Sequence, residues 1–260
     1  MSVSNKSLNH TRKASSLKNT IQNEQPIDWN KVALYVSKQY AQFHSKKIHI
    51  TPQKRLEMIR ICFTDLLSRV YHHDNDEIKV YIEKRDEENK KLRIIEQKVK
   101  TDIEEMLDTK EVYSASSFSA NTNLSGESDL DFNIPFDILD KKLVQLSNQC
   151  GLYGYKFVEV RSEDNPGIHY VFQKIVDDVE IEVKLRHKPF YIQVHHKMHD
   201  YLDNHMPQIH KDTITWIKHK LNQLSKQNST KKKAYKLFKA MYYEQAISHA
   251  QVYKMLYPLE

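Results

Sequence analysis

The sequence of 260 residues predicts an α+β protein in which a small mixed β-sheet is preceded and followed by helices. Apolar residues recur at helical spacing from about residue 28 to residue 108, and again after residue 191. Between these segments, apolar and polar residues alternate in several runs, which is the pattern of strands with one buried face. We therefore expect a disordered basic tail (1–26), an N-terminal helical region (27–110), a sheet-bearing region (111–190) and a C-terminal basic helical region (191–260).

The composition predicts an intracellular protein without a membrane-spanning segment. Apolar residues make up 39% of the chain, enough for a sizeable core. The mean hydropathy is −0.71, and no apolar run is long enough for a transmembrane helix. The N-terminus also lacks the apolar stretch of a signal peptide. Cys62 and Cys150 lie far apart within helical patterns, as expected of reduced thiols, so we expect the nucleus or the cytoplasm.

Two helices are expected at the start of the N-terminal helical region. Asp28 is a suitable N-cap for the first, which should run to about His44. Thr51 as N-cap and Pro52 at the first helical position begin the second, whose apolar side chains keep helical spacing as far as Val70.

A third, long helix is expected from about Asp76 to Asp108. Nine consecutive polar residues, from Glu83 to Lys91, interrupt its apolar face. Such a stretch indicates a solvated face, a break in the helix or a contact with a partner, so helix 76–108 is a candidate surface for a protein partner.

The sheet-bearing region predicts strands separated by one helix and by turn residues. Asp177 and Asp178 form a two-residue connection between the last two strands, which identifies a hairpin. The expected elements are strands at 111–115 and 129–132, a helix at 135–151, and strands at 155–160, 169–176 and 179–186.

Asp129 and Asp131 are the first candidate site residues. In a strand, residues two apart project from the same face, so these carboxylates should point together while Leu130 and Phe132 point into the core. Two adjacent acids on one face repel each other. A divalent cation between them would relieve the repulsion, and oxygen ligands suit Mg²⁺ or Mn²⁺.

The stretch from Ser116 to Phe132 resembles the signature of the nucleotidyltransferase superfamily, which includes polymerase β, poly(A) polymerases, CCA-adding enzymes and cyclic dinucleotide synthases. The family pattern is Gly-Ser, a loop with Gly-Thr and Leu-Pro-Gly, and then Ser-Asp-hydrophobic-Asp-hydrophobic. Ser116 stands at the family's Gly, Ser117 at its Ser, Thr122 at the loop Thr, Leu124 and Gly126 at Leu-x-Gly, and Ser128, Asp129, Leu130, Asp131 and Phe132 at the final element.

The resemblance implies a nucleotidyltransferase palm domain and a set of site residues. A third carboxylate from a later strand is expected at Glu182, with Glu180 as the alternative, and the carboxylates would hold Mg²⁺ or Mn²⁺. The nucleoside triphosphate (NTP) would be bound by Ser116, Ser117, Thr122 and Ser128, with Lys218, Lys236 and Lys239 as candidate lysines of the C-terminal helices.

Two functions follow from this resemblance. The first is transfer of a nucleoside monophosphate from an NTP to a hydroxyl acceptor, with an RNA 3′ end as the expected acceptor. The second is a catalytically inactive subunit with the same fold that binds nucleic acid or scaffolds a larger complex. Ser116 in place of Gly, and Glu in place of the more usual third Asp, motivate the second. Ser128, Asp129 and Asp131 are retained, so we expect the first.

The C-terminal part is basic. From Val183 to the end there are fourteen Lys and Arg against five Asp and Glu. This charge favours nucleic acid as a partner, although a solvated lysine-rich helix face has the same composition. His195 and His199, four residues apart, leave a zinc-binding helical module as a third hypothesis.

Overall fold

The computed structural model describes residues 26–45, 50–114, 117–118, 120–124, 129–162, 168–187, 197–198, 200–227 and 229–249. These residues form an α+β fold with a mixed sheet of five strands, so the predicted fold class is confirmed at that level. The predictions for the tail up to residue 25, and for Ser116, Ser128, His195 and His199, fall outside the described residues.

The first two helices, α2 and α3, begin at the residues that their capping signals predict. The Asp28 side chain accepts hydrogen bonds from the backbone N–H groups of Asn30 and Lys31 at the start of α2. Thr51 accepts one from Lys54 at the start of α3. The helices are α2 (Trp29–Phe43), α3 (Pro52–Met106), α4 (Phe136–Gln149), a π-helical turn η2 (Tyr201–His205), α6 (Gln208–Ser225) and α7 (Ser229–His249).

The second and third predicted helices follow each other without a loop as α3, of 55 residues, and the predicted boundary at residues 71–75 coincides with a kink in it. The chain leaves helical dihedral angles only at Asp74 (φ −108°, ψ 23°), where α3 is kinked. The Asp74 carboxylate is buried there and accepts hydrogen bonds from Trp216 Nε1 (2.7 Å) and His73 Nδ1 (2.8 Å). Those contacts compensate the polar side chain for its burial at the kink.

The sheet has the strand order β1-β2-β5-β4-β3. Only β2 and β5 pair in parallel, and the other neighbours are antiparallel. Asp177 and Asp178 have positive φ values of 50° and 63°, which a two-residue hairpin turn between β4 and β5 requires. The strands are β1 (Tyr113–Ser114), β2 (Asp129–Ile134), β3 (Lys156–Ser162), β4 (Ile168–Val176) and β5 (Val179–His187).

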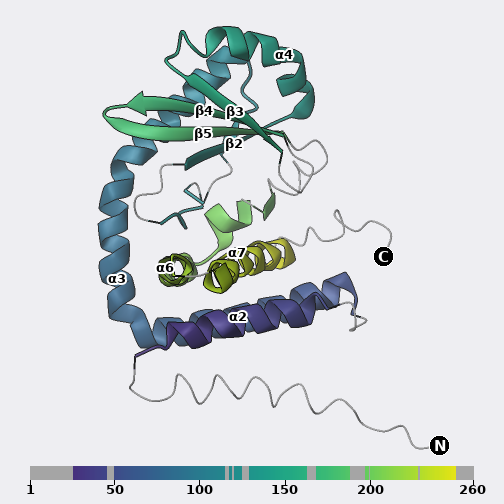
Figure 1. Cartoon of the computed structure of the whole chain (residues 1–260), viewed down its shortest axis with the longest axis vertical. Coiled ribbons are helices and arrows are strands. Elements are labelled where there is room, and N and C mark those ends of the chain that lie inside the picture. The colour runs from purple at the N-terminus through teal and green to yellow at the C-terminus, as the bar shows by residue number, and fades with distance from the viewer. Residues whose placement is uncertain are drawn as a thin grey trace, which may run out of the picture.

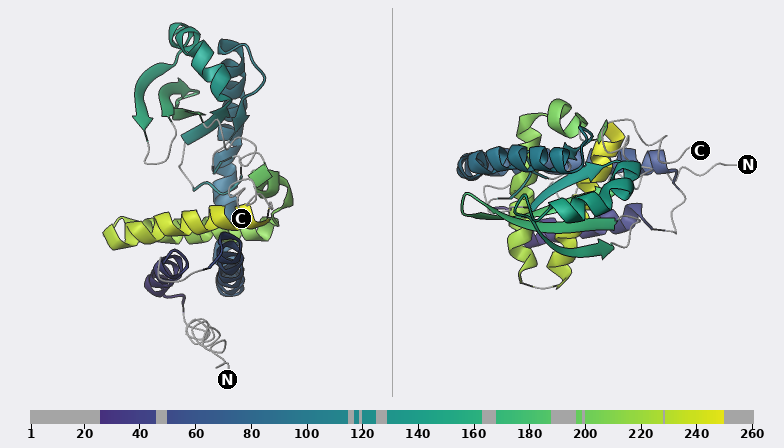
Figure 2. Two further views of the ribbon diagram at one scale, coloured as in Figure 1. Left: turned by 90° about the vertical axis from the view of Figure 1, so that its right-hand side faces the viewer. Right: turned by 90° about the horizontal axis from the view of Figure 1, so that it is seen from above.

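The apolar side chains form two separate cores, one at each end of α3 (Figures 1 and 2). In what we call the helical lobe, α2, α6, α7 and the first part of α3 pack around residues such as Val36, Phe63 and Phe238. In the sheet lobe, α4 and the last part of α3 cover one face of the sheet around Ile95, Phe132 and Val183. Within the part of the chain that the structure describes, no helix is long and apolar enough to cross a membrane.

Candidate functional site

Asp129 and Asp131 lie on the face of the sheet that is turned away from the core. The intervening residues, Leu130 and Phe132, are at most 1% exposed and pack in the sheet lobe. Because side chains alternate along a strand, the two carboxylates point to the opposite face, on the side where α6 and α7 lie in Figure 1. The expected orientation of this pair is therefore present.

The register of the parallel β2–β5 pair brings Glu182 to the same place. Asp129 pairs with Glu182 and Asp131 with Lys184, and residues directly paired in neighbouring strands share a face. Glu180 lies before the first β2–β5 pair, exposed and opposite Ile175 of β4. Glu182, not Glu180, thus lies beside Asp129, and we call Asp129, Asp131 and Glu182 the carboxylate cluster.

Lys184 lies within this cluster. Its Nζ is 2.8 Å from Asp129 Oδ2 and 2.8 Å from Glu182 Oε1, and its side chain is only 14% exposed. Burial lowers the pKa of this ammonium, but the hydrogen bonds that it donates to Asp129 and Glu182, together with the charge of Asp131, outweigh burial and raise the pKa above its usual value. Lys184 is therefore charged at neutral pH and bridges two of the three carboxylates.

The cluster has the donor atoms for a hard divalent cation, but they now face an ammonium. Mg²⁺ and Mn²⁺ prefer carboxylate oxygens, and the common contact with Lys184 Nζ shows that Asp129 and Glu182 reach one cation together. In the described part of the chain, no three Asp, Glu, His or Cys side chains are grouped around a point that could hold a metal ion. The residues fit the ion chemically, and two of them, Asp129 and Glu182, contact the Lys184 ammonium in this structure.

The segment 117–124, described at residues 117–118 and 120–124, is the loop that the resemblance assigns to phosphate binding. Asn121 has a positive φ of 55°, and its N–H donates to the Phe118 carbonyl oxygen (3.0 Å). Arg85 of α3 donates to Asn121 O (3.1 Å), and Arg93 donates to Asn121 Oδ1 (2.8 Å). The loop is therefore fixed against the middle of α3 by charged donors.

A second group of contacts fixes the end of this loop. The amides of Asn89 and Asn123 are both buried and donate to each other (3.0 and 2.9 Å). Lys218 of α6 donates to the Thr122 carbonyl oxygen. Thr122 is fully buried, and its backbone N–H donates to the Ser117 carbonyl oxygen (2.8 Å). Lys218 is also buried, so two predicted nucleotide-binding residues, Thr122 and Lys218, stabilise the loop in this structure, and Ser117 is part of the same turn.

The other two candidate lysines lie on α7, which packs on α2, α3 and α6. Lys236 is exposed, and the Nζ of Lys239 is 5.7 Å from the centre of the Tyr235 ring. The exposed Lys226, Lys232 and Lys233 lie at or near the α6–α7 turn. These lysines form a basic surface of the helical lobe.

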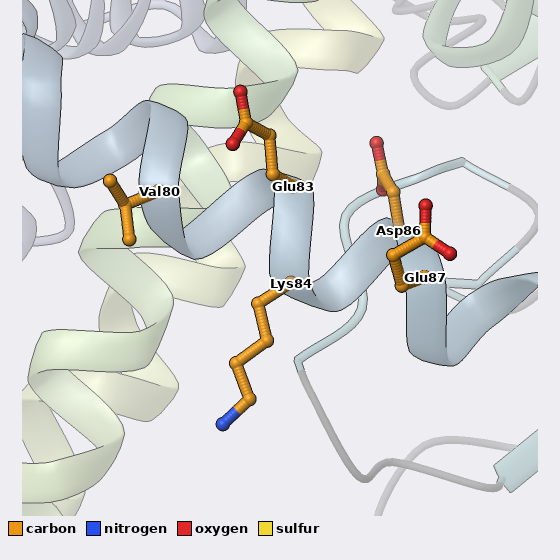
Figure 3. Close-up of a pocket in the computed structure, with 5 residues that line it drawn as sticks. All are labelled: Val80, Glu83, Lys84, Asp86 and Glu87. Atoms are coloured by element: carbon orange, nitrogen blue, oxygen red, sulfur yellow. The ribbon is translucent and has the colours of Figure 1, made fainter.

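The polar stretch 83–91 of α3 has two different sides. Arg85 and Asn89 are buried against the loop and α6, with Arg85 also donating to Thr215 Oγ1 (3.2 Å). The other side is exposed and lines a shallow hollow (Figure 3). Its lining residues are Val80, Glu83, Lys84, Asp86 and Glu87.

Sequence reasoning missed Lys184 and Arg85. The only signal for Lys184 was its position two residues after Glu182, on the same face of the strand. Arg85 gave no signal, because a buried arginine within a charged stretch looks like a solvated one.

A comparison of the chain with protein-family models, with curated proteins and with solved structures finds no match in any of the three.

Proposed function

We propose that the protein is an intracellular nucleotidyltransferase with a polymerase β-like palm, which transfers a nucleoside monophosphate from an NTP to a hydroxyl group. The observation that carries the proposal is the β2–β5 register. It places Glu182 beside Asp129 on the face that also presents Asp131. Three carboxylates on one face of two adjacent strands is the arrangement that the signature implies.

Each part of this sheet face and its loop has a role in the proposed reaction. Asp129, Asp131 and Glu182 would hold Mg²⁺ or Mn²⁺, which when bound lowers the pKa of the attacking hydroxyl and neutralises the triphosphate. Ser117 and the backbone N–H groups beside it would bind phosphate oxygens, whereas those of Asn121 and Thr122 donate within the turn. Arg85 and Lys218 hold that loop in place by donating to the carbonyl oxygens of Asn121 and Thr122.

The basic surface of the helical lobe supports a nucleic acid as the acceptor. Lys232, Lys233 and Lys236 are exposed on α7, and lysines that neutralise phosphates release counterions from a polyanion. An RNA 3′ hydroxyl is the acceptor we propose. Binding through this surface should weaken as salt concentration rises.

A second candidate function is supported by Lys184. Its ammonium neutralises part of the carboxylate charge that a divalent cation would otherwise neutralise. If the ammonium is not displaced, the protein is an inactive subunit that binds nucleic acid, or a protein partner through the exposed side of α3. Both candidates use the same fold and differ in whether a metal ion enters.

The test is transfer of label from each NTP to an RNA oligonucleotide in Mg²⁺ or Mn²⁺. We expect Asp129→Asn/Asp131→Asn and Glu182→Gln to lower the rate by about a thousandfold or more, since a catalytic metal ion is worth several kcal/mol. Glu180→Gln should retain most of the rate, because Glu180 lies outside the β2–β5 register.

Asp178→Asn is the matched control. Asp178 lies in the β4–β5 turn at positive φ, a conformation that Asn also tolerates. This variant loses a carboxylate from the same sheet at a distance from the cluster, so its rate should equal that of the wild type. Transfer that survives in the double variant, or no transfer with any NTP, would contradict the proposed enzyme.

A further inference from the structure

Lys184 lies among the three carboxylates of the cluster. It pairs with Asp131 in the β2–β5 register and contacts Asp129 and Glu182 with its ammonium, each at 2.8 Å. All three carboxylates thus lie around one side chain of the same sheet face. Glu182 and Lys184 are two residues apart on β5, so their common orientation is a consequence of the strand itself.

The Lys184 ammonium lies where it offsets the negative charge of the carboxylate cluster. Three carboxylates on two adjacent strands repel one another, and without a cation this repulsion destabilises the sheet. One ammonium offsets one of these charges and forms hydrogen bonds with two of the groups. The Lys184 and Glu182 side chains are only 14% and 24% exposed, so their contact is screened less than that of a surface pair, whereas Asp129 is 57% exposed and its contact is screened more.

A divalent cation would need the same oxygen atoms. Mg²⁺ binds carboxylate oxygens at about 2.0–2.1 Å, closer than the 2.8 Å of the present N–O contacts. An ammonium and a metal ion on the same two oxygens would also repel each other. The long, flexible stem of lysine allows the ammonium to leave without a change in the strand.

We propose that Lys184 is a tethered counter-ion of the carboxylate cluster, which holds Asp129 and Glu182 together in the metal-free protein and must be displaced before a divalent cation binds. The inference rests on the proposed function for the identity of the displacing ion, a divalent metal. It assigns Lys184 a role as the residue that sets how tightly this site binds metal. Lys184 then acts on the metal site through Asp129 and Glu182, two of the carboxylates that would bind the metal ion.

Binding of Mn²⁺ without nucleotide tests this role directly. The electron paramagnetic resonance signal of free Mn²⁺ reports binding to the wild type, Lys184→Met and Lys184→Gln, with no need for activity. We expect both variants to bind one Mn²⁺ about 10-fold or more tightly than the wild type, because no charge-assisted hydrogen bonds have to be broken first. Asp129→Asn in the Lys184→Met background should remove this binding.

Thermal unfolding in chelator and in Mn²⁺ provides a second readout. Lys184→Met should melt below the wild type in chelator, and Mn²⁺ should raise its melting temperature more than that of the wild type. Lys156→Met is the control, because Lys156 is exposed on the edge strand β3 of the same sheet. This variant should match the wild type in both conditions.

The outcomes separate the counter-ion from the proposed enzyme. Tighter Mn²⁺ binding by both Lys184 variants supports the counter-ion, even when neither the variants nor the wild type transfers a nucleotide. Equal Mn²⁺ affinity of the wild type and the variants overturns the counter-ion, even when the wild type is an active transferase. Lys184→Gln keeps an uncharged hydrogen-bonding group at this position, so it serves if Lys184→Met does not fold.

Discussion

The helical lobe and the sheet lobe share one helix but differ in what their surfaces carry. The helical lobe presents exposed lysines such as Lys232 and Lys236, whereas the sheet lobe presents the carboxylate cluster. Both cores are apolar, yet the contact between the lobes at the middle of α3 is polar. Burial of apolar surface stabilises each lobe but does not depend on orientation. Hydrogen bonds do depend on orientation, and those from Arg85 and Asn89 fix the loop between the lobes.

The largest effects are expected from equal cavities in the two cores. Phe132 and Phe238 are both fully buried, one in each lobe. Phe132→Ala and Phe238→Ala should each lower the free energy of unfolding by about 3–5 kcal/mol. Amide hydrogen exchange should accelerate mainly in β2, β4 and β5 for the first variant, and mainly in α2, α6 and α7 for the second. Equal acceleration throughout the chain with either variant would show one cooperative unit in place of two lobes.

Arg85→Met should have the next largest effect, because it removes a buried charged donor that fixes the loop between the lobes. Arg85 is fully buried, and its loss leaves the Asn121 carbonyl oxygen and the Thr215 hydroxyl without their charged donor. We expect a loss of about 3 kcal/mol in urea unfolding. Exchange of the amides at 120–124 should accelerate more than exchange in either core. Lys84→Met, an exposed neighbour on α3, should change neither quantity.

Lys218→Met compares an anchoring lysine with an exposed one. The Lys218 ammonium donates to the Thr122 carbonyl oxygen in a buried site, so its removal should cost about 2 kcal/mol. NTP binding should weaken as well, because the loop that would bind phosphates loses its support. Lys236→Met should leave the free energy of unfolding within about 0.5 kcal/mol of the wild type, since Lys236 is exposed on α7. Unchanged stability of Lys218→Met would contradict the anchoring role.

Local signals predicted the elements that carry the site. The caps at Asp28 and Thr51 and the Asp177–Asp178 turn depend on neighbouring residues, so their positions could be read from the chain. The alternation of polar and apolar residues on two strands predicted the common face of Asp129 and Asp131. It could not choose between Glu180 and Glu182, because that choice depends on the β2–β5 register.

What the sequence did not predict involves polar residues whose partners are distant along the chain. Asp74, at the kink of α3, is buried with its carboxylate bonded to Trp216, 142 residues away. Arg85 and Asn89 are buried within a stretch that has the composition of a solvated face. Polar side chains have the same local pattern whether water or a protein group binds them, so their burial is settled by the tertiary fold.

The smallest effect is a gain in stability, expected at Asp203 of η2. Burial raises the pKa of this carboxyl to about 6 from 3.8, with the Lys211 ammonium opposing and the Glu96 carboxylate adding to the rise. The folded state therefore binds the proton more tightly than the unfolded state. The stability that this proton contributes is present below pH 3.8 and is lost as the pH rises through about 6.

Asp203→Asn removes this loss. We expect the variant to be more stable than the wild type by at most about 1 kcal/mol at pH 8, well below the full shift, because the residue as a whole is exposed to solvent. The difference should shrink as the pH falls and disappear well below 3.8, where Asp203 is protonated in both states. Glu83→Gln, an exposed change on α3, should show no such pH-dependent gain. A variant that is less stable than the wild type at pH 8 would mean that ionised Asp203 stabilises η2, and that its attraction to Lys211 outweighs its burial.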